Sequence, residues 1–200
     1  MIKNVVFDFG QVLCHFDEKY IVYPYVSKEE RDLVSRVVLD RLYWDRLDAG
    51  TISDKDAVLK MQERLPKHLR ASAEKIYYGW IDNLPEVEGM RELISYIKEK
   101  YNVRCFLLSN ISPYFVNNRH RVPILELLDG YTFSGTLGIT KPDTRIYEHL
   151  LSQHGLRAEE TIFIDDKAEN IEGALGVGIC GYIFDGNVKG LKGYLDKILG

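Results

Sequence analysis

The stretch Ile2–Gly10 reads I-K-N-V-V-F-D-F-G, an apolar run that carries one acid, Asp8, just before a glycine. Such a run is typical of a strand that is buried on both faces, as in a parallel sheet. A lone carboxylate is poorly tolerated inside a sheet unless it is paired or holds a metal. At the carboxyl end of a parallel strand it opens instead into the crevice where α/β sheets bind ligands. We therefore expect Asp8 to be a functional residue at that edge of the sheet.

The segment that follows, from Tyr20 to Asn83, is predicted to be helical and contains no convincing strand. Ser27 begins a capping box ahead of a first helix. Ser53 caps a second helix, which ends at Pro66, and a third begins near Arg70. We therefore expect three packed helices between the first strand and the rest of the chain.

Beyond residue 85 the sequence alternates between helices and strands. Strands are predicted at 103–108, 131–133, 161–164 and 179–184, and helices at 87–97, 142–151, 168–175 and 191–199. Pro142 is expected in the first turn of its helix, where a missing N–H costs nothing. This alternation indicates an α/β fold with a parallel sheet, into which the earlier helical segment is inserted after the first strand.

Composition excludes several classes of partner. The chain has 200 residues, 46% of them hydrophobic and 28% charged, with a formal net charge of -4. That charge gives no electrostatic footprint for nucleic acid or an anionic membrane. No apolar run reaches the roughly 20 residues of a membrane helix, and the N-terminus does not have the pattern of a signal peptide. A cytoplasmic protein, either a monomer or a homodimer, is the expectation.

The three cysteines, Cys14, Cys105 and Cys180, are an odd number and show no C-x-x-C spacing. Neither a disulfide framework nor a zinc site is indicated. Cys105 and Cys180 fall in predicted strands, where we expect them to be small buried hydrophobic residues.

Three predicted strands end in polar residues, namely Asp8, Ser109–Asn110 and Asp165–Asp166, and Lys141 lies in a turn just before a helix. The carboxyl ends of parallel strands share one edge, so these groups are expected to converge. Carboxylate oxygens suit Mg²⁺, and the ammonium and hydroxyl groups suit phosphate oxygens.

The order of D-F-G, L-L-S-N, K-P and I-D-D-K-A-E-N along the chain resembles the haloacid dehalogenase superfamily. In that family Asp8 matches the nucleophile, Ser109 the phosphate-binding hydroxyl and Lys141 the lysine that neutralises charge. Asp165 and Asp166 match the metal-binding acids. The resemblance implies a Rossmann-like parallel sheet flanked by helices, with a small helical cap inserted after the first strand. It divides the chain into a core, residues 1–16 and 84–200, and a cap, residues 17–83.

Within the superfamily the chain is most similar to the branch that includes bacterial sugar-1-phosphate phosphatases and the N-terminal domain of epoxide hydrolase. The implied activity is Mg²⁺-dependent hydrolysis of a small phosphorylated metabolite, such as a sugar 1-phosphate, through an aspartyl-phosphate on Asp8. Two alternatives stay open. One is a 2-haloacid dehalogenase, which attacks carbon and needs no metal, although the acid doublet argues against it. The other is a catalytically weakened member that serves as a binding or regulatory protein.

The resemblance also implies roles for the neighbouring groups. Asp8, Asp166 and the backbone carbonyl of Gly10 are expected to bind Mg²⁺, with Asp165 bound directly or through water. Asn170, four residues past Asp166, is expected to orient that acid.

For the phosphate, Ser109, Asn110 and Lys141 are the expected ligands. Trp44, in the predicted cap, is the candidate contact for the rest of the substrate.

One position departs from the family pattern. Most phosphatases of the superfamily carry a second Asp two residues after the nucleophile as general acid and base, whereas this chain has Gly10. Losing a proton donor typically costs about 10²–10⁴-fold in rate. Either another group donates the proton, with His15 and Asp45 as candidates, or the leaving group barely needs one. We favour the second explanation because an anomeric phosphate leaves easily.

Overall fold

The computed structural model, which describes residues 1–200, contains one five-stranded sheet in the order β3-β2-β1-β4-β5, and every neighbouring pair is parallel. The strands are β1 (Asn4–Phe7), β2 (Arg104–Ser109), β3 (Gly130–Phe133), β4 (Thr161–Asp165) and β5 (Cys180–Ile183). Phe7 pairs with Leu107 on one side and with Ile164 on the other. Asp8 therefore leaves the central strand between the ends of β2 and β4, and the predicted parallel α/β sheet is confirmed.

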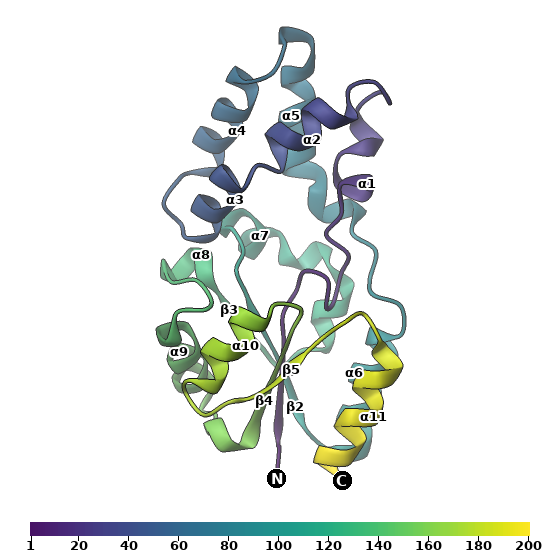
Figure 1. Ribbon diagram of the computed structural model, residues 1–200, viewed down its shortest axis with the longest axis vertical. Helices are drawn as coiled ribbons and strands as arrows, with labels where there is room; N and C mark the ends of the chain where they lie inside the picture. The colour runs from purple at the N-terminus through teal and green to yellow at the C-terminus, as the bar shows by residue number, and fades with distance from the viewer.

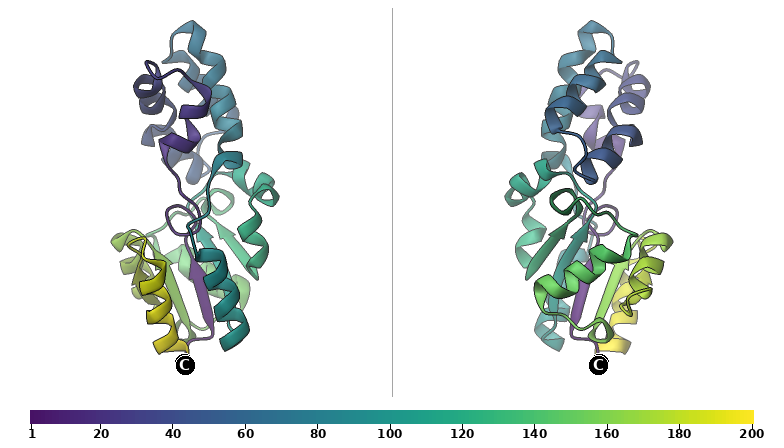
Figure 2. Two further views of the ribbon diagram at one scale, coloured as in Figure 1. Left: turned by 90° about the vertical axis from the view of Figure 1, so that its right-hand side faces the viewer. Right: turned by 90° about the vertical axis from the view of Figure 1, so that its left-hand side faces the viewer.

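Helices cover both faces of this sheet (Figure 2). α6 (Met90–Tyr101) and α11 (Val188–Leu199) lie on one face, and α9 (Thr144–His154) and α10 (Ala168–Leu175) on the other. Side chains alternate between the two layers, since Val5 and Phe7 join the larger core cluster and Val6 joins the smaller one. This period of two is the packing expected of a strand that is buried on both sides.

The segment between β1 and α6 forms a separate group of helices at one end of the molecule, opposite the two chain termini (Figure 1). It contains five α-helices, α1 (Glu18–Ile21), α2 (Arg31–Val38), α3 (Arg41–Asp48), α4 (Asp54–Glu63) and α5 (Arg70–Gly79). The prediction of three helices was wrong because it missed the short α1, which Asp17 caps, and because the hydrophobic pattern did not separate α2 from α3. Asp40 makes that break, since its carboxylate accepts from the N–H of Leu42 at 2.9 Å and caps α3.

Two further α-helices and six short 3₁₀ helices complete the chain. The α-helices are α7 (Pro113–Asn118) and α8 (Ser134–Leu137). The 3₁₀ helices are Tyr23–Tyr25, Lys67–Leu69, Trp80–Asn83, Arg119–Arg121, Pro123–Leu127 and Ala158–Glu160. No helix of this protein combines the length and the apolar character that crossing a membrane requires.

Two short segments connect the helical group to the sheet, and they lie side by side. The N–H of His15 donates to the carbonyl of Pro85, and the N–H of Val87 donates to the carbonyl of Leu13, both at 2.9 Å. This crossing lies next to the limits expected from the sequence. We propose residues 1–16 and 84–200 as a core domain and residues 17–83 as a cap domain.

Two local predictions were wrong. Pro142 lies outside α9, because Asp143 caps that helix by accepting from the N–H of Arg145 at 3.0 Å. Cys180 is exposed rather than buried, because β5 is an edge strand whose side chains are only partly covered. Cys14 and Cys105 are buried.

Candidate active site

A buried lysine joins two carboxylates at the carboxyl edge of the sheet. The Nζ atom of Lys141 donates to Asp8 Oδ1 at 2.6 Å, to Asp165 Oδ2 at 2.7 Å and to the carbonyl of Leu108 at 3.1 Å. Lys141 is 5% exposed, Asp8 9% and Asp165 fully buried. A buried charge is tolerated only when it is paired, and here one ammonium meets two carboxylates. The expected convergence of these three strand-end and turn residues is therefore present.

Asp165 has donors on both of its oxygens. The N–H of Lys167 donates to Oδ1 at 2.8 Å, and the amide of Asn170 donates to Oδ1 at 3.0 Å and to Oδ2 at 2.9 Å. We expected Asn170 to orient Asp166, and this is corrected: it orients Asp165. The reason is that Asn170 lies in the first turn of α10, directly after β4, so its amide points back at the end of that strand.

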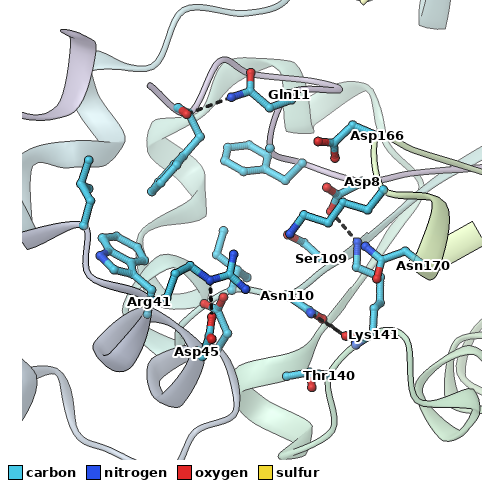
Figure 3. Close-up of a pocket in the computed structure, with 18 of the residues that line it drawn as sticks. Asp8, Gln11, Arg41, Asp45, Ser109, Asn110, Thr140, Lys141, Asp166 and Asn170 are labelled. Carbon is cyan, nitrogen blue, oxygen red and sulfur yellow. Dashed lines mark hydrogen bonds and ion pairs between the residues drawn. The ribbon is translucent and has the colours of Figure 1, made fainter. Parts of the chain in front are cut away.

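Asp166 differs from its neighbour in having no side-chain partner. It is half-buried, lines the cavity, and makes no hydrogen bond or ion pair with another residue. Burial and the nearby Asp165 carboxylate raise the pKa of Asp166. Figure 3 shows its carboxylate on the same side of the cavity as Asp8.

This edge of the sheet has oxygen atoms of the kind that bind a hard cation. One carboxylate oxygen from each of Asp8, Asp165 and Asp166 lies within 4.8 Å of the others. Gly10 lines the same cavity, and its backbone carbonyl accepts no hydrogen bond within the protein. Three carboxylates and a free carbonyl are oxygen ligands of the kind that Mg²⁺ prefers, so the residues fit such an ion.

Burial and charge set the protonation of the cluster. Burial raises the pKa of Asp8 to about 6, with the Asp165 carboxylate adding to the rise and Lys141 opposing it. Burial alone would lower the pKa of Lys141, but Asp8 and Asp165 outweigh it and the pKa is raised. At neutral pH the lysine is therefore charged, and Asp8 is mostly an ionised carboxylate.

The loop after β2 presents Ser109 and Asn110 to the cavity. Ser109 is 2% exposed and lines the cavity. The Asn110 side chain, an expected phosphate ligand, is instead bound to the backbone of Lys141: Nδ2 donates to its carbonyl at 3.0 Å, and Oδ1 accepts from its N–H at 2.8 Å. The backbone N–H groups of Asn110 and Gly10 donate to no group in the protein. These two N–H groups are therefore free donors beside Asp8.

Cap and core together enclose a cavity of about 470 Å³ above this edge. The wall opposite this edge is aromatic: the ring centroid of Trp44 lies 5.2 Å from that of Phe16, the last residue of the first core segment, and 5.6 Å from that of Trp80. The Trp44 N–H donates to the carbonyl of Val38 at 2.6 Å, so the indole is held in place within the wall. Trp44 thus lies where a substrate contact was expected.

The two expected proton donors are placed differently. His15 does not line the cavity, and its ring centroid lies 6.4 Å from that of Tyr20. Asp45 lines the cavity but accepts from Arg41 Nε at 2.8 Å (Figure 3). The cavity also contains Asp48, which sequence reasoning missed. Its spacing of three residues from Asp45 placed both acids on one helix face, a signal that was available.

Comparison with known sequences agrees with this site. A sequence model described as haloacid dehalogenase-like hydrolase matches residues 2–178. The chain is 32% identical over 182 residues to a sesquiterpene phosphatase of Aspergillus oryzae, which covers 90% of this chain and 88% of that protein. It is 27% identical over 184 residues to a D-ribitol-5-phosphate phosphatase of Bacteroides thetaiotaomicron, which covers 86% of each.

Solved structures share the fold. A HAD family enzyme from Bacteroides thetaiotaomicron, in complex with magnesium and inorganic phosphate, has a TM-score of 0.72 at 18% identity and covers 94% of this chain and 96% of that chain. The L-2-haloacid dehalogenase from Xanthobacter autotrophicus, with chloropropionic acid covalently bound, has a TM-score of 0.66 at 15% identity, covering 90% and 76%. The strand-end cluster and the sequence matches lead to one conclusion: this chain belongs to the haloacid dehalogenase-like hydrolases.

Proposed function

We propose that this hydrolase is a Mg²⁺-dependent phosphatase that acts on a small phosphorylated metabolite through an aspartyl-phosphate on Asp8. The observation that carries the proposal is the buried Asp8–Lys141–Asp165 cluster with the unpartnered Asp166 beside it. A dehalogenase attacks carbon and has no need of an additional free acid at this edge. A phosphatase needs such an acid to hold Mg²⁺. The cation is required because a doubly charged substrate must approach a carboxylate nucleophile.

In this proposal Asp8, Asp166 and the Gly10 carbonyl hold the ion. Asp165 binds Lys141, which in turn binds Asp8. When bound, Mg²⁺ supplies positive charge that draws the phosphate oxygens toward Asp8. Lys141 holds Asp8 Oδ1 in place and offsets the negative charge of the pair.

The free donors bind the transferring group. The N–H groups of Gly10 and Asn110, with the Ser109 hydroxyl, are positioned to receive phosphate oxygens, because all three residues line the cavity beside Asp8. Asp8 then attacks phosphorus in line, the bond to the leaving oxygen breaks, and water hydrolyses the aspartyl-phosphate.

The leaving group faces the cap, and two substrate classes suit that wall. A sugar phosphate, including the sugar 1-phosphates expected from the sequence, has hydroxyls for polar groups such as Arg41 and Asp45. The phosphate of an apolar alcohol suits Phe16, Trp44 and Trp80 instead. The relatives point in both directions, since one is named for a sesquiterpene and the other for ribitol 5-phosphate.

A substrate panel tests the proposal. Phosphate release is measured with glucose 1-phosphate, ribitol 5-phosphate, farnesyl monophosphate and p-nitrophenyl phosphate, each with Mg²⁺ and with EDTA, and chloride release with 2-chloropropionate. Metal-dependent phosphate release supports the proposal and ranks the two substrate classes. Chloride release would support a dehalogenase, and neither product would support a binding role.

A further inference from the structure

Asp48, the last residue of α3, lines the cavity from the cap side and is the one acid there with neither a cation nor a known role. Its carboxylate makes no hydrogen bond or ion pair within the protein. By contrast, Asp8 is paired with Lys141 and Asp45 with Arg41. A partly buried carboxyl without a partner is costly, so it is most easily explained by a function.

The backbone of Asp48 is fastened to the core. Its carbonyl accepts from Ser134 Oγ at 2.6 Å, and the same hydroxyl accepts from the N–H of Ile111 at 2.9 Å. The following turn approaches the core closely, because a Cβ on Gly50 would lie 2.7 Å from the carbonyl oxygen of Gly135. The end of α3 is thus held against the loop that presents Ser109 and Asn110, and Asp48 has a fixed position relative to the proposed phosphate site.

Resting on the proposed function, we propose that Asp48 is the general acid and base of this phosphatase and replaces the carboxyl that Gly10 lacks. This proposal departs from the explanation favoured from the sequence, in which the leaving group barely needs a proton. In-line attack by Asp8 places the leaving oxygen on the opposite side of phosphorus, which is the side of the cavity that the cap lines. Asp48 comes from that side, whereas His15 lies outside the cavity and Asp45 is already bound to Arg41.

The proton balance is complete with this residue. In the first step the Asp8 oxygen bonds to phosphorus, the bond to the leaving oxygen breaks, and the Asp48 carboxyl gives its proton to that oxygen. In the second step Asp48, now a carboxylate, takes a proton from water as the water oxygen bonds to phosphorus. Phosphate leaves, Asp8 is restored as a carboxylate, and Asp48 is again protonated.

The electrostatics of the cavity agree with this role. Burial raises the pKa of Asp48 to about 7, and the Asp45 and Asp8 carboxylates add to the rise. Arg41 and Lys167 face it as well and oppose the rise. A group that both donates and accepts protons works best with a pKa near the working pH.

Two aryl phosphates of similar size test the proposal, because they differ mainly in how much the leaving oxygen needs a proton. Phenol, with a pKa of about 10 like tyrosine, is a poor leaving group, and p-nitrophenol is a good one. We expect Asp48→Asn to lower kcat/KM for phenyl phosphate by about 10²-fold or more and to change that for p-nitrophenyl phosphate by less than about threefold. Asp32→Asn, at an acid on α2 whose side chain is 90% exposed, is the control that leaves both values unchanged.

A second variant gives an independent arm. Adding Gly10→Asp to Asp48→Asn should restore phenyl phosphate hydrolysis, because it supplies a carboxyl where most phosphatases of the superfamily have one. The new side chain fits, since its Cβ would meet only Phe16 Cβ, at 3.9 Å. Equal losses on both substrates, a loss with Asp45→Asn instead, or no effect of Asp48→Asn would each overturn the role of Asp48. A wild-type protein that hydrolyses neither compound with Mg²⁺ would overturn the proposed function as well, so the two failures are distinguishable.

Discussion

The core edge and the cap wall face each other across one cavity, yet they are built differently. At the core edge, charges are buried and paired: Lys141 binds Asp8 and Asp165, and Asn170 completes the set of donors to Asp165. The cap wall is an aromatic surface of Trp44 and Trp80, extended by Phe16 from the end of the first core segment, with a few charged groups. Buried charge pairs tolerate little change, whereas a packed aromatic wall accepts substitution. We infer that the core edge fixes the reaction, with Asp48 as the one cap residue that takes part in it, and that the aromatic wall sets the substrate.

The largest effect is expected when the pairing at the core edge is broken. Lys141→Met leaves the buried Asp8 and Asp165 carboxylates without their cation, which should lower the free energy of unfolding by about 3–5 kcal/mol and abolish activity. The deficit should shrink as the pH falls from 8 toward about 6. Burial already raises the pKa of Asp8 to about 6, and this pKa rises further without the lysine. The folded variant therefore loses most stability at a pH where Asp8 must be ionised, and regains it once the carboxyl is protonated. Urea unfolding at pH 5 and pH 8 measures this.

Lys55→Met, at an exposed position on α4, is the matched control and should change neither stability nor activity. A stable, active Lys141→Met protein would mean that the pairing at the core edge does not define the site.

The next effect concerns Asp166, the one acid of the strand-end cluster that has no partner. Asp166→Asn removes a proposed Mg²⁺ ligand, and an ion contributes several kcal/mol to transition-state charge stabilisation. We expect phosphatase activity to fall by about 10²–10³-fold at low Mg²⁺ and to recover partly as Mg²⁺ is raised. Activity measured as a function of Mg²⁺ concentration checks this, and a titration curve identical to that of the wild type would contradict it.

On the cap side, Asp48→Asn should stabilise the protein rather than weaken it. A carboxyl whose pKa is raised on folding opposes folding as pH rises from about 4 through 7, because the folded state disfavours its charge. The variant should therefore be more stable by up to about 4 kcal/mol at pH 8 and equal to the wild type near pH 4. Thermal unfolding at the two pH values measures the difference, and a destabilised variant at pH 8 would show that Asp48 has a structural role.

The smallest effect is expected in the aromatic wall. Trp44→Phe keeps an aromatic ring but removes the indole N–H that donates to Val38. We expect KM for the preferred substrate to rise by roughly tenfold or less, with kcat within about twofold, because only contacts to the leaving group change. Steady-state kinetics separate the two constants. A loss confined to kcat would place Trp44 in the chemistry and contradict the assignment of the aromatic wall to substrate binding.

The sequence predicted the core edge better than the cap, and the reason is geometric. Strand-end residues such as Asp8 and Asp165 must meet, because the carboxyl ends of parallel strands share an edge. The cap offers no such rule, since side chains there are brought together by helix packing and by breaks such as the one at Asp40. Asp48 was missed because its spacing from Asp45 shows only that the two acids share a helix face, and not that this face lines a cavity. The partner of Asn170 was misassigned because spacing alone does not tell which of two adjacent acids points back into the sheet.

Mass spectrometry of the acid-quenched protein during turnover of p-nitrophenyl phosphate with Mg²⁺ tests the role of Asp8 most directly. Our account predicts that the wild-type protein gains the mass of one phosphoryl group on the peptide that contains Asp8, and that Asp8→Asn neither gains it nor releases phosphate. Continued phosphate release by Asp8→Asn, or a phosphoryl group on another residue, would contradict it.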